Sequence, residues 1–231
     1  MKSAFLALSR VAGFLATLYV WRQVQMVDFS EFTGFTIVIL PILLVIPASW
    51  VGRKIIDVKP TVERLARITS AVHLVLMILF GSAIVASVRF FQIRRGPELP
   101  LPVEVSTILL SITGFFLLLT VFNLALSGLG APFAIASSKR IANRWLYRWT
   151  RNPMVLCTLA VLISAGFYFQ SLYFVLWAIL LVTPAWIYFL KVYEERELEI
   201  RFGTPYLDYK AVTSFLWPRS PKGRTQAANS L

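Results

Sequence analysis

The sequence is poor in the residues that build disulfide frameworks and metal centres. Its 231 residues include one cysteine, Cys157, and one histidine, His73. A single cysteine excludes an internal disulfide framework. One histidine without Asp, Glu or Cys neighbours predicts no metal site, and we interpret His73 as a hydrogen-bonded packing residue. Acidic residues are also scarce, at 11 against 23 Lys and Arg, so the formal net charge is +12.

Long apolar runs dominate the rest of the chain, and 58% of its residues are hydrophobic. Several runs reach the roughly 20 apolar residues that cross a hydrocarbon core. The sequence therefore predicts an all-α, polytopic transmembrane helical bundle. Arg10 interrupts the first span, and Pro41 and Pro47 predict a kink in the second. We expect about six spans: Ala4–Trp21, Gly34–Val51, Ile68–Val88, Val105–Leu126, Met154–Phe169 and Leu172–Leu190.

The basic residues predict the orientation of this bundle. If both termini are cytoplasmic, most of the 23 Lys and Arg fall in cytoplasmic segments, as the positive-inside rule requires. The expected partners of this charge are the bilayer and its anionic headgroups, not nucleic acid. The oligomeric state stays open. The segment 219–231 is polar and predicts a disordered tail.

The last two predicted spans are joined only by about Gln170-Ser171, which predicts a tight antiparallel hairpin. Such a hairpin returns the chain to the side from which it started. Arg151-Asn152-Pro153 should therefore lie beside Glu194-Glu195, although some forty residues separate them in the sequence. We expect a cationic and acidic pocket at the cytoplasmic mouth of the bundle.

An acidic run follows the last span and contains Glu194, Glu195, Glu197 and Glu199. Gly203 predicts a helix stop. Thr204 as N-cap and Pro205 as first helical residue then predict a short helix that carries Tyr206 and Tyr209. Taken alone, this run is typical of a solvated helix end with an i,i+4 pair between Glu197 and Arg201.

The segment 127–153 precedes the hairpin. Its Gly128-Leu129-Gly130 is not a dinucleotide fingerprint, because a third glycine and a preceding strand are missing. A basic and aromatic run follows, and two interpretations remain. The run is either an interfacial aromatic belt or a loop that binds anionic groups and a planar ring. Its members are Arg144, Trp145, Tyr147, Arg148, Trp149 and Arg151.

Two motifs in this half of the chain resemble a known family. Tyr147-Arg148-Trp149-Thr150-Arg151-Asn152-Pro153 resembles the Tyr-Arg-x-x-Arg-(His/Asn)-Pro signature of membrane methyltransferases, typified by isoprenylcysteine carboxyl methyltransferase and phospholipid methyltransferases. Gly128-x-Gly130-Ala131-Pro132 is similar to the Gly-x-Gly-Thr-Pro element that often precedes it. The sequence departs from the family at Trp145-Leu146, where Gly-Pro is usual, and at Val155, where Tyr is usual.

The second motif is similar to the family's C-terminal signature. It comprises Glu194-Glu195, Leu198, Phe202-Gly203, Tyr206, Tyr209 and Val212, and it ends at Pro218. The resemblance covers about 127–218, whereas the preceding spans show none. It divides the chain into N-terminal spans over 1–126, a methyltransferase-like region over 127–218 and the tail.

The resemblance implies an S-adenosylmethionine-dependent methyltransferase. Its cofactor pocket would be formed by the loop before the hairpin, the hairpin itself and the short C-terminal helix. The implied acceptor is a lipid or prenylated molecule that enters from the bilayer, and the methylated atom stays open among O, N and S. No metal is implied. The implied catalytic residues are Arg151 and Glu194. The implied cofactor contacts are Tyr147, Arg151, Asn152, Pro153, Glu194, Glu195, Tyr206 and Tyr209.

Two other functions are weighed against this one. Membrane reductases of the sterol and enone type have a comparable C-terminal bundle and use NADPH, whose phosphates suit an arginine-rich loop. Glu194-Glu195 followed by Phe202-Gly203 favours the methyltransferase. A non-catalytic membrane protein such as a transporter would favour internal repeats and polar groups at the bilayer midplane, and the sequence displays neither.

Overall fold

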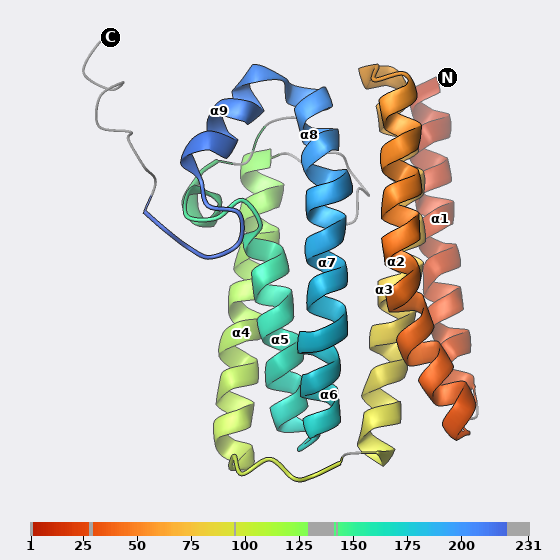
Figure 1. Ribbon diagram of the computed structural model, residues 1–231, viewed down its shortest axis with the longest axis vertical. Helices are drawn as coiled ribbons and strands as arrows, with labels where there is room; N and C mark the ends of the chain where they lie inside the picture. Colours follow the sequence, from red (N-terminus) through yellow and green to blue (C-terminus); the bar gives the residue numbers. More distant parts are fainter. Residues whose placement is uncertain (1, 28–29, 95, 129–140, 142, 221–231) are drawn as a thin grey trace.

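The computed structural model describes residues 2–27, 30–94, 96–128, 141 and 143–220 (Figure 1). Over these residues it contains helices and no strand, which confirms the predicted all-α fold class. The first five long helices are α1 (Lys2–Met26), α2 (Glu31–Val58), α3 (Val62–Ile93), α4 (Val103–Asn123) and α5 (Pro153–Tyr168).

One continuous helix follows α5, and we call Leu172–Phe202 the last helix. It consists of α6 (Leu172–Trp177), α7 (Thr183–Phe189) and α8 (Glu195–Phe202), joined by π-helical turns η4 (Ala178–Val182) and η5 (Leu190–Glu194). A short helix, α9 (Thr204–Val212), folds back from its end. The remaining elements are the π turn η1 (Leu124–Gly128) and the 3-10 helix η3 (Trp145–Arg148).

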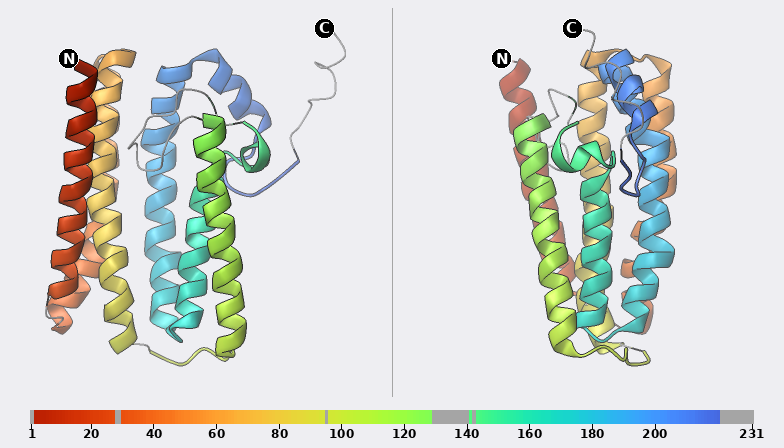
Figure 2. Two further views of the ribbon diagram at one scale, coloured as in Figure 1. Left: turned by 180° about the vertical axis from the view of Figure 1, so that it is seen from behind. Right: turned by 90° about the vertical axis from the view of Figure 1, so that its left-hand side faces the viewer.

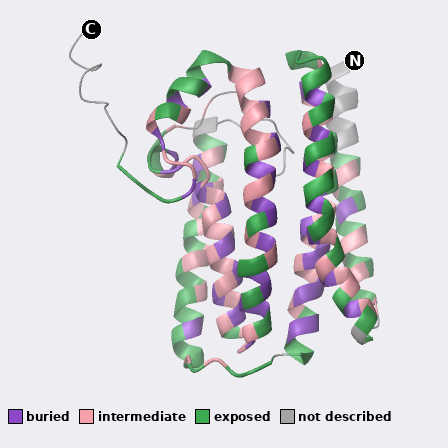
Figure 3. Ribbon diagram, viewed as in Figure 1, coloured by how far each residue is buried: buried purple, intermediate pink, exposed green. Residues whose placement is uncertain are grey.

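The long helices form two groups that lie side by side (Figures 1 and 2). In one group α3 packs against α1 and α2, and in the other α5 packs against α4 and the last helix. The last helix joins the groups because it also packs on α2 and α3. Phe80 stacks on Trp186 across this junction at 4.7 Å between ring centroids, and Trp177 Nε1 donates to the Val38 carbonyl at 3.1 Å. Buried residues gather along the same junction, whereas α4 is largely exposed (Figure 3).

Four of the six predicted spans coincide with helices that are long and apolar enough to cross a membrane. These are Phe32–Val58, Val62–Ile93, Val103–Leu126 and Leu172–Phe202. The first predicted span begins within residues 4–10, whose side chains lie outside the described residues, and it stays a prediction. The fifth predicted span falls outside this set. Helix α5 has 16 residues and spans about 24 Å, less than the ~30 Å hydrocarbon core.

The predicted hairpin between α5 and the last helix is confirmed. Helix α5 ends at Tyr168 and the next helix begins at Leu172, where the Ser171 side chain accepts a hydrogen bond from the Phe174 backbone N–H at 3.2 Å. Gly166 permits the close approach of the two helices. A Cβ atom at this position would lie 2.6 Å from Cγ2 of Val175 and 3.2 Å from the Val175 backbone nitrogen.

Gly166→Ala should therefore destabilise the hairpin. An added methyl group must displace Val175 and its backbone, and overpacking of this kind costs about 1–3 kcal/mol. The measurement is thermal unfolding of the purified protein in detergent. Gly114→Ala is the matched control, because a Cβ at Gly114 meets nothing within 4 Å. The control should be neutral or slightly stabilising. Equal melting temperatures for the two variants would contradict the packing argument.

The predicted break at Gly203 is confirmed, since the last helix ends at Phe202 and Gly203 has a φ of 60°. The predicted start of the next helix was one residue late. Helix α9 begins at Thr204, Gly203 occupies the N-cap position, and the Thr204 hydroxyl is not the cap. The left-handed Gly203 supplies the turn by itself, so a capping hydroxyl is not needed there.

Candidate functional site

The chain after α9 is fastened to the segment that precedes α5. We call Thr213–Arg219 the C-terminal strap. Arg151 N–H donates to the Ser214 carbonyl at 2.8 Å, and Arg219 N–H donates to the Trp149 carbonyl at 3.0 Å. The side chains of Asn152 and Thr150 both donate to the Phe215 carbonyl, at 2.8 and 3.2 Å. The strap thus lies against residues 149–152 of the first sequence motif, in the region where both motifs meet.

Arg151 lies at the centre of this region. Its Nη2 donates to Glu195 Oε1 at 2.6 Å, which confirms that the two ends of the hairpin are neighbours. Its Nη1 donates to the backbone carbonyls of Lys210 and Thr213, at 2.9 and 2.5 Å. The guanidinium carbon lies 5.7 Å from the Phe215 ring centroid. The Arg151 Nε atom is buried and has no hydrogen-bond partner within the described residues.

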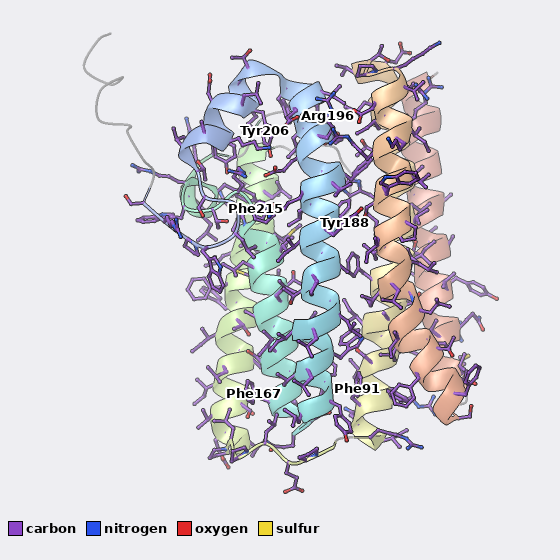
Figure 4. All side chains as sticks on the ribbon, in the orientation of Figure 1. Phe91, Phe167, Tyr188, Arg196, Tyr206 and Phe215 are labelled. Atoms are coloured by element: carbon purple, nitrogen blue, oxygen red, sulfur yellow. The ribbon has the colours of Figure 1, made fainter. Side chains whose placement is uncertain are left out.

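An unbroken chain of ion pairs joins Arg151 to α2 on the far side of the last helix. Lys210 bridges Glu195 and Glu199 at 2.7 and 3.0 Å. Arg196 then bridges Glu199 and Asp57, at 3.4 and 2.9 Å, and Figure 4 shows Arg196 between the last helix and α2. Arg53 closes the chain by pairing with Asp57. In order, its members are Arg53, Asp57, Arg196, Glu199, Lys210, Glu195 and Arg151.

Glu194 stands apart from this chain of ion pairs. Its carboxylate makes no hydrogen bond and no ion pair with any residue that the structure describes, although its neighbour Glu195 makes two ion pairs. Glu194 is only partly exposed. Burial raises the pKa of the Tyr147 phenol, and the charge of Glu194 raises it further. Glu194 is therefore close enough to Tyr147 to interact with it electrostatically. The two glutamates therefore differ: Glu195 is held by ion pairs, whereas Glu194 has none with a described residue.

Three buried tyrosines lie beside these carboxylates. Tyr209 Oη donates to the Tyr147 carbonyl at 2.6 Å, which ties α9 to η3. The rings of Tyr206 and Tyr209 are 6.2 Å apart between centroids. Burial, followed by the charge of Glu195, raises the pKa of Tyr206, so its phenol stays neutral. Asn152 precedes Pro153 at the N-terminus of α5. The structure thus brings the sequence-predicted site residues to one end of the bundle, around the start of α5 and the end of the last helix.

The pair between Glu197 and Arg201 exists as predicted, but its surroundings correct the expectation of a solvated helix end. Glu197 is 2% exposed and accepts a hydrogen bond from Thr69 on α3 at 3.2 Å. Thr69 also contacts the Tyr193 hydroxyl at 3.2 Å. The outward extension of the last helix is thus packed against α3, which buries one side of the acidic run.

His73 is a packing residue in this structure. Its Nδ1 lies 2.9 Å from the Thr69 carbonyl, and its ring meets those of Phe189 and Tyr193 edge to face, at 5.6 and 6.3 Å between centroids. No group of three or more His, Cys, Asp or Glu able to hold a metal occurs among the described residues.

Sequence reasoning missed the residues that hold the site in place. Asp57 and Thr69 come from α2 and α3, 139 and 128 positions away from their partners Arg196 and Glu197, so no local spacing could reveal them. Lys210 could have been suspected as a cation on the helix that carries both tyrosines. Gly130-Ala131-Pro132 of the upstream motif and the tail from 221 lie outside the described residues, as does the side chain of Arg10.

Four long apolar helices and a cluster of charged and aromatic groups at one end of the bundle define an integral membrane protein. Residues 103–205 match the model of a family described as phospholipid methyltransferase, which confirms the resemblance to membrane methyltransferases. The matched region includes α4, which the sequence analysis grouped with the N-terminal spans. It ends before Tyr206 and the C-terminal strap. No curated protein and no solved structure matches the chain.

Proposed function

We propose that this protein transfers a methyl group from S-adenosylmethionine to a lipophilic acceptor within the bilayer, a lipid or a prenylated molecule. The family match supports methyl transfer on membrane lipids. The observation that carries the assignment of the site is the Glu194 carboxylate, which lies among buried tyrosines and is unpaired within the described residues. In contrast, the three carboxylates of α8 that follow it are all paired.

The residues present fit this cofactor. S-adenosylmethionine has a carboxylate, an ammonium, ribose hydroxyls and an adenine. The buried Nε of Arg151 lacks a partner among the described residues and is a donor suited to a carboxylate. Glu194 is an acceptor suited to the ammonium or the ribose hydroxyls. Tyr147, Tyr206 and Tyr209 offer rings to the adenine, with Glu195, Asn152 and Pro153 forming the frame around them.

When bound, the cofactor supplies an activated methyl group on its sulfonium. The contribution of this chain is then binding, orientation and exclusion of water. The ion-pair chain from Arg53 to Arg151 fixes α8 and α9 relative to α2 and α5, so that Glu194 and the tyrosines keep one arrangement. Both termini are placed in the cytoplasm in this proposal, with the acceptor entering from the bilayer.

Isothermal titration calorimetry of the full chain in nanodiscs tests the proposed cofactor. S-adenosylmethionine should bind with micromolar affinity and NADPH should not bind, because the unpaired Glu194 carboxylate would repel NADPH phosphates placed beside it. Binding of NADPH without binding of S-adenosylmethionine would overturn the proposal and favour the reductase. Binding of neither would favour a non-catalytic protein.

A further inference from the structure

Helices α4 and α5 differ in length, and the difference appears at one end only. At the end remote from the site, Gln170 after α5 donates to the Leu101 carbonyl just before α4, at 2.8 Å. From that common level the span Val103–Leu126 has 24 residues and extends about 36 Å. Helix α5 extends only about 24 Å. Near the site α4 therefore projects about 12 Å beyond the first residue of α5.

Helix η3 lies beside this projecting part of α4, which it contacts. The C-terminal strap is hydrogen-bonded to Trp149 and Arg151, directly after η3. Figure 1 shows both segments at the height of the upper part of α4, below the level of α8 and α9. If α4 crosses the bilayer, these segments lie at the depth where hydrocarbon gives way to headgroups, although neither is itself a membrane span.

The exposed side chains of these two segments suit that depth. Trp145, Trp149 and Trp217 are 66%, 48% and 68% exposed. Tryptophan concentrates at membrane–water interfaces, because its ring is largely apolar and its indole N–H is polar. In contrast, Trp177 and Trp186 lie in the core at 4% and 8%.

Three exposed arginines accompany these tryptophans: Arg144, Arg148 and Arg219. None of them forms an ion pair with a carboxylate in the part of the chain that the structure describes. Nearby Arg151, Arg196 and Arg201 each do. Unpaired guanidiniums between exposed tryptophans present a positive, hydrogen-bonding surface that is complementary to phosphate groups at the bilayer surface.

We propose that these six residues form an interfacial surface that binds anionic phospholipid headgroups of the surrounding bilayer. The inference goes beyond the proposed methyl transfer and does not depend on it. Bound headgroups would hold η3 and the strap, whose backbone bonds to Arg151 and Asn152 frame the candidate site. We define the interfacial surface as Arg144, Trp145, Arg148, Trp149, Trp217 and Arg219.

Native mass spectrometry of the full chain, released from nanodiscs of mixed phosphatidylglycerol and phosphatidylcholine, tests this proposal. The unaltered protein should retain phosphatidylglycerol in preference to phosphatidylcholine. The double variant Arg144→Gln/Arg219→Gln should lose that preference, by about fivefold for each guanidinium removed. Arg144→Lys/Arg219→Lys should keep most of it, because the charges remain.

The matched control is Lys59→Gln/Arg67→Gln, which removes two exposed cations near the same end of the bundle, one directly after α2 and one on α3. This control should keep the preference for phosphatidylglycerol. Hydrogen exchange of residues 213–219 supplies a second readout, which should slow when phosphatidylglycerol replaces phosphatidylcholine. Equal retention of both lipids by the unaltered protein, or equal losses in the two glutamine double variants, would overturn the proposal.

Discussion

Glu194→Gln should weaken the binding of S-adenosylmethionine by roughly tenfold to a hundredfold, without lowering the melting temperature. Hydrogen bonds to a charged group are worth about 1.5–3 kcal/mol, which corresponds to that range in dissociation constant. Stability should not fall, because the Glu194 carboxylate forms no hydrogen bond or ion pair with the described residues and its partial burial opposes the charge. Calorimetry and thermal unfolding on the same preparation give both quantities.

Asp208→Asn is the control for this result. It removes one negative charge near the same end of the bundle, at an exposed residue of α9 that forms no ion pair within the described residues. Cofactor binding should be nearly unchanged in this variant. If both variants lose affinity equally, the effect is one of overall charge, and Glu194 is not a ligand of the cofactor.

Arg201→Ala should produce the largest loss of stability. It leaves the Glu197 carboxylate, 2% exposed, with Thr69 as its hydrogen-bond partner. Breaking a buried ion pair by removing one partner costs about 3–5 kcal/mol. A drop of several degrees in the melting temperature in detergent is the expected observation.

Two further variants show whether burial of the charge is the cause. Arg196→Ala removes a guanidinium whose pair with Asp57 is one third exposed on both sides, and such pairs contribute at most about 1 kcal/mol. The double variant Arg201→Ala/Glu197→Gln removes both buried charges and should regain much of the lost stability. A double variant no more stable than Arg201→Ala would refute this explanation.

The parts of the fold that depend on local sequence were predictable. The apolar runs predicted α2, α3, α4 and the last helix, because their lengths follow from the thickness of the hydrocarbon core. The short connection at Gln170-Ser171 predicted the hairpin, and the hairpin in turn predicted that Arg151 meets Glu195. Hydrogen bonding now confirms that contact at 2.6 Å.

The difference between Glu195, which is ion-paired, and Glu194, which has no ion pair with a described residue, was not predictable. Both are acidic residues at the end of an apolar run, and only the positions of Arg151 and Lys210 distinguish them. Likewise, a count of apolar residues did not predict that α5 stops short of a full span. The residues that precede α5, among them Trp149, Arg151 and Asn152, do not extend the helix. They form hydrogen bonds with the C-terminal strap instead.

The π turn η5 sets the orientation of the entire acidic run. The Glu195 N–H bonds to the Leu190 carbonyl, so this turn contains one residue more than an α turn, and every later side chain is displaced by about 100° around the axis. Arg53 Nη1 donates to the Val192 carbonyl within the turn at 3.2 Å. In this register Glu195 faces Arg151 and Glu197 faces Thr69. A one-residue insertion thus sets which glutamates of the acidic run meet a partner within the protein: Glu195 and Glu197 do, and Glu194 has none among the described residues.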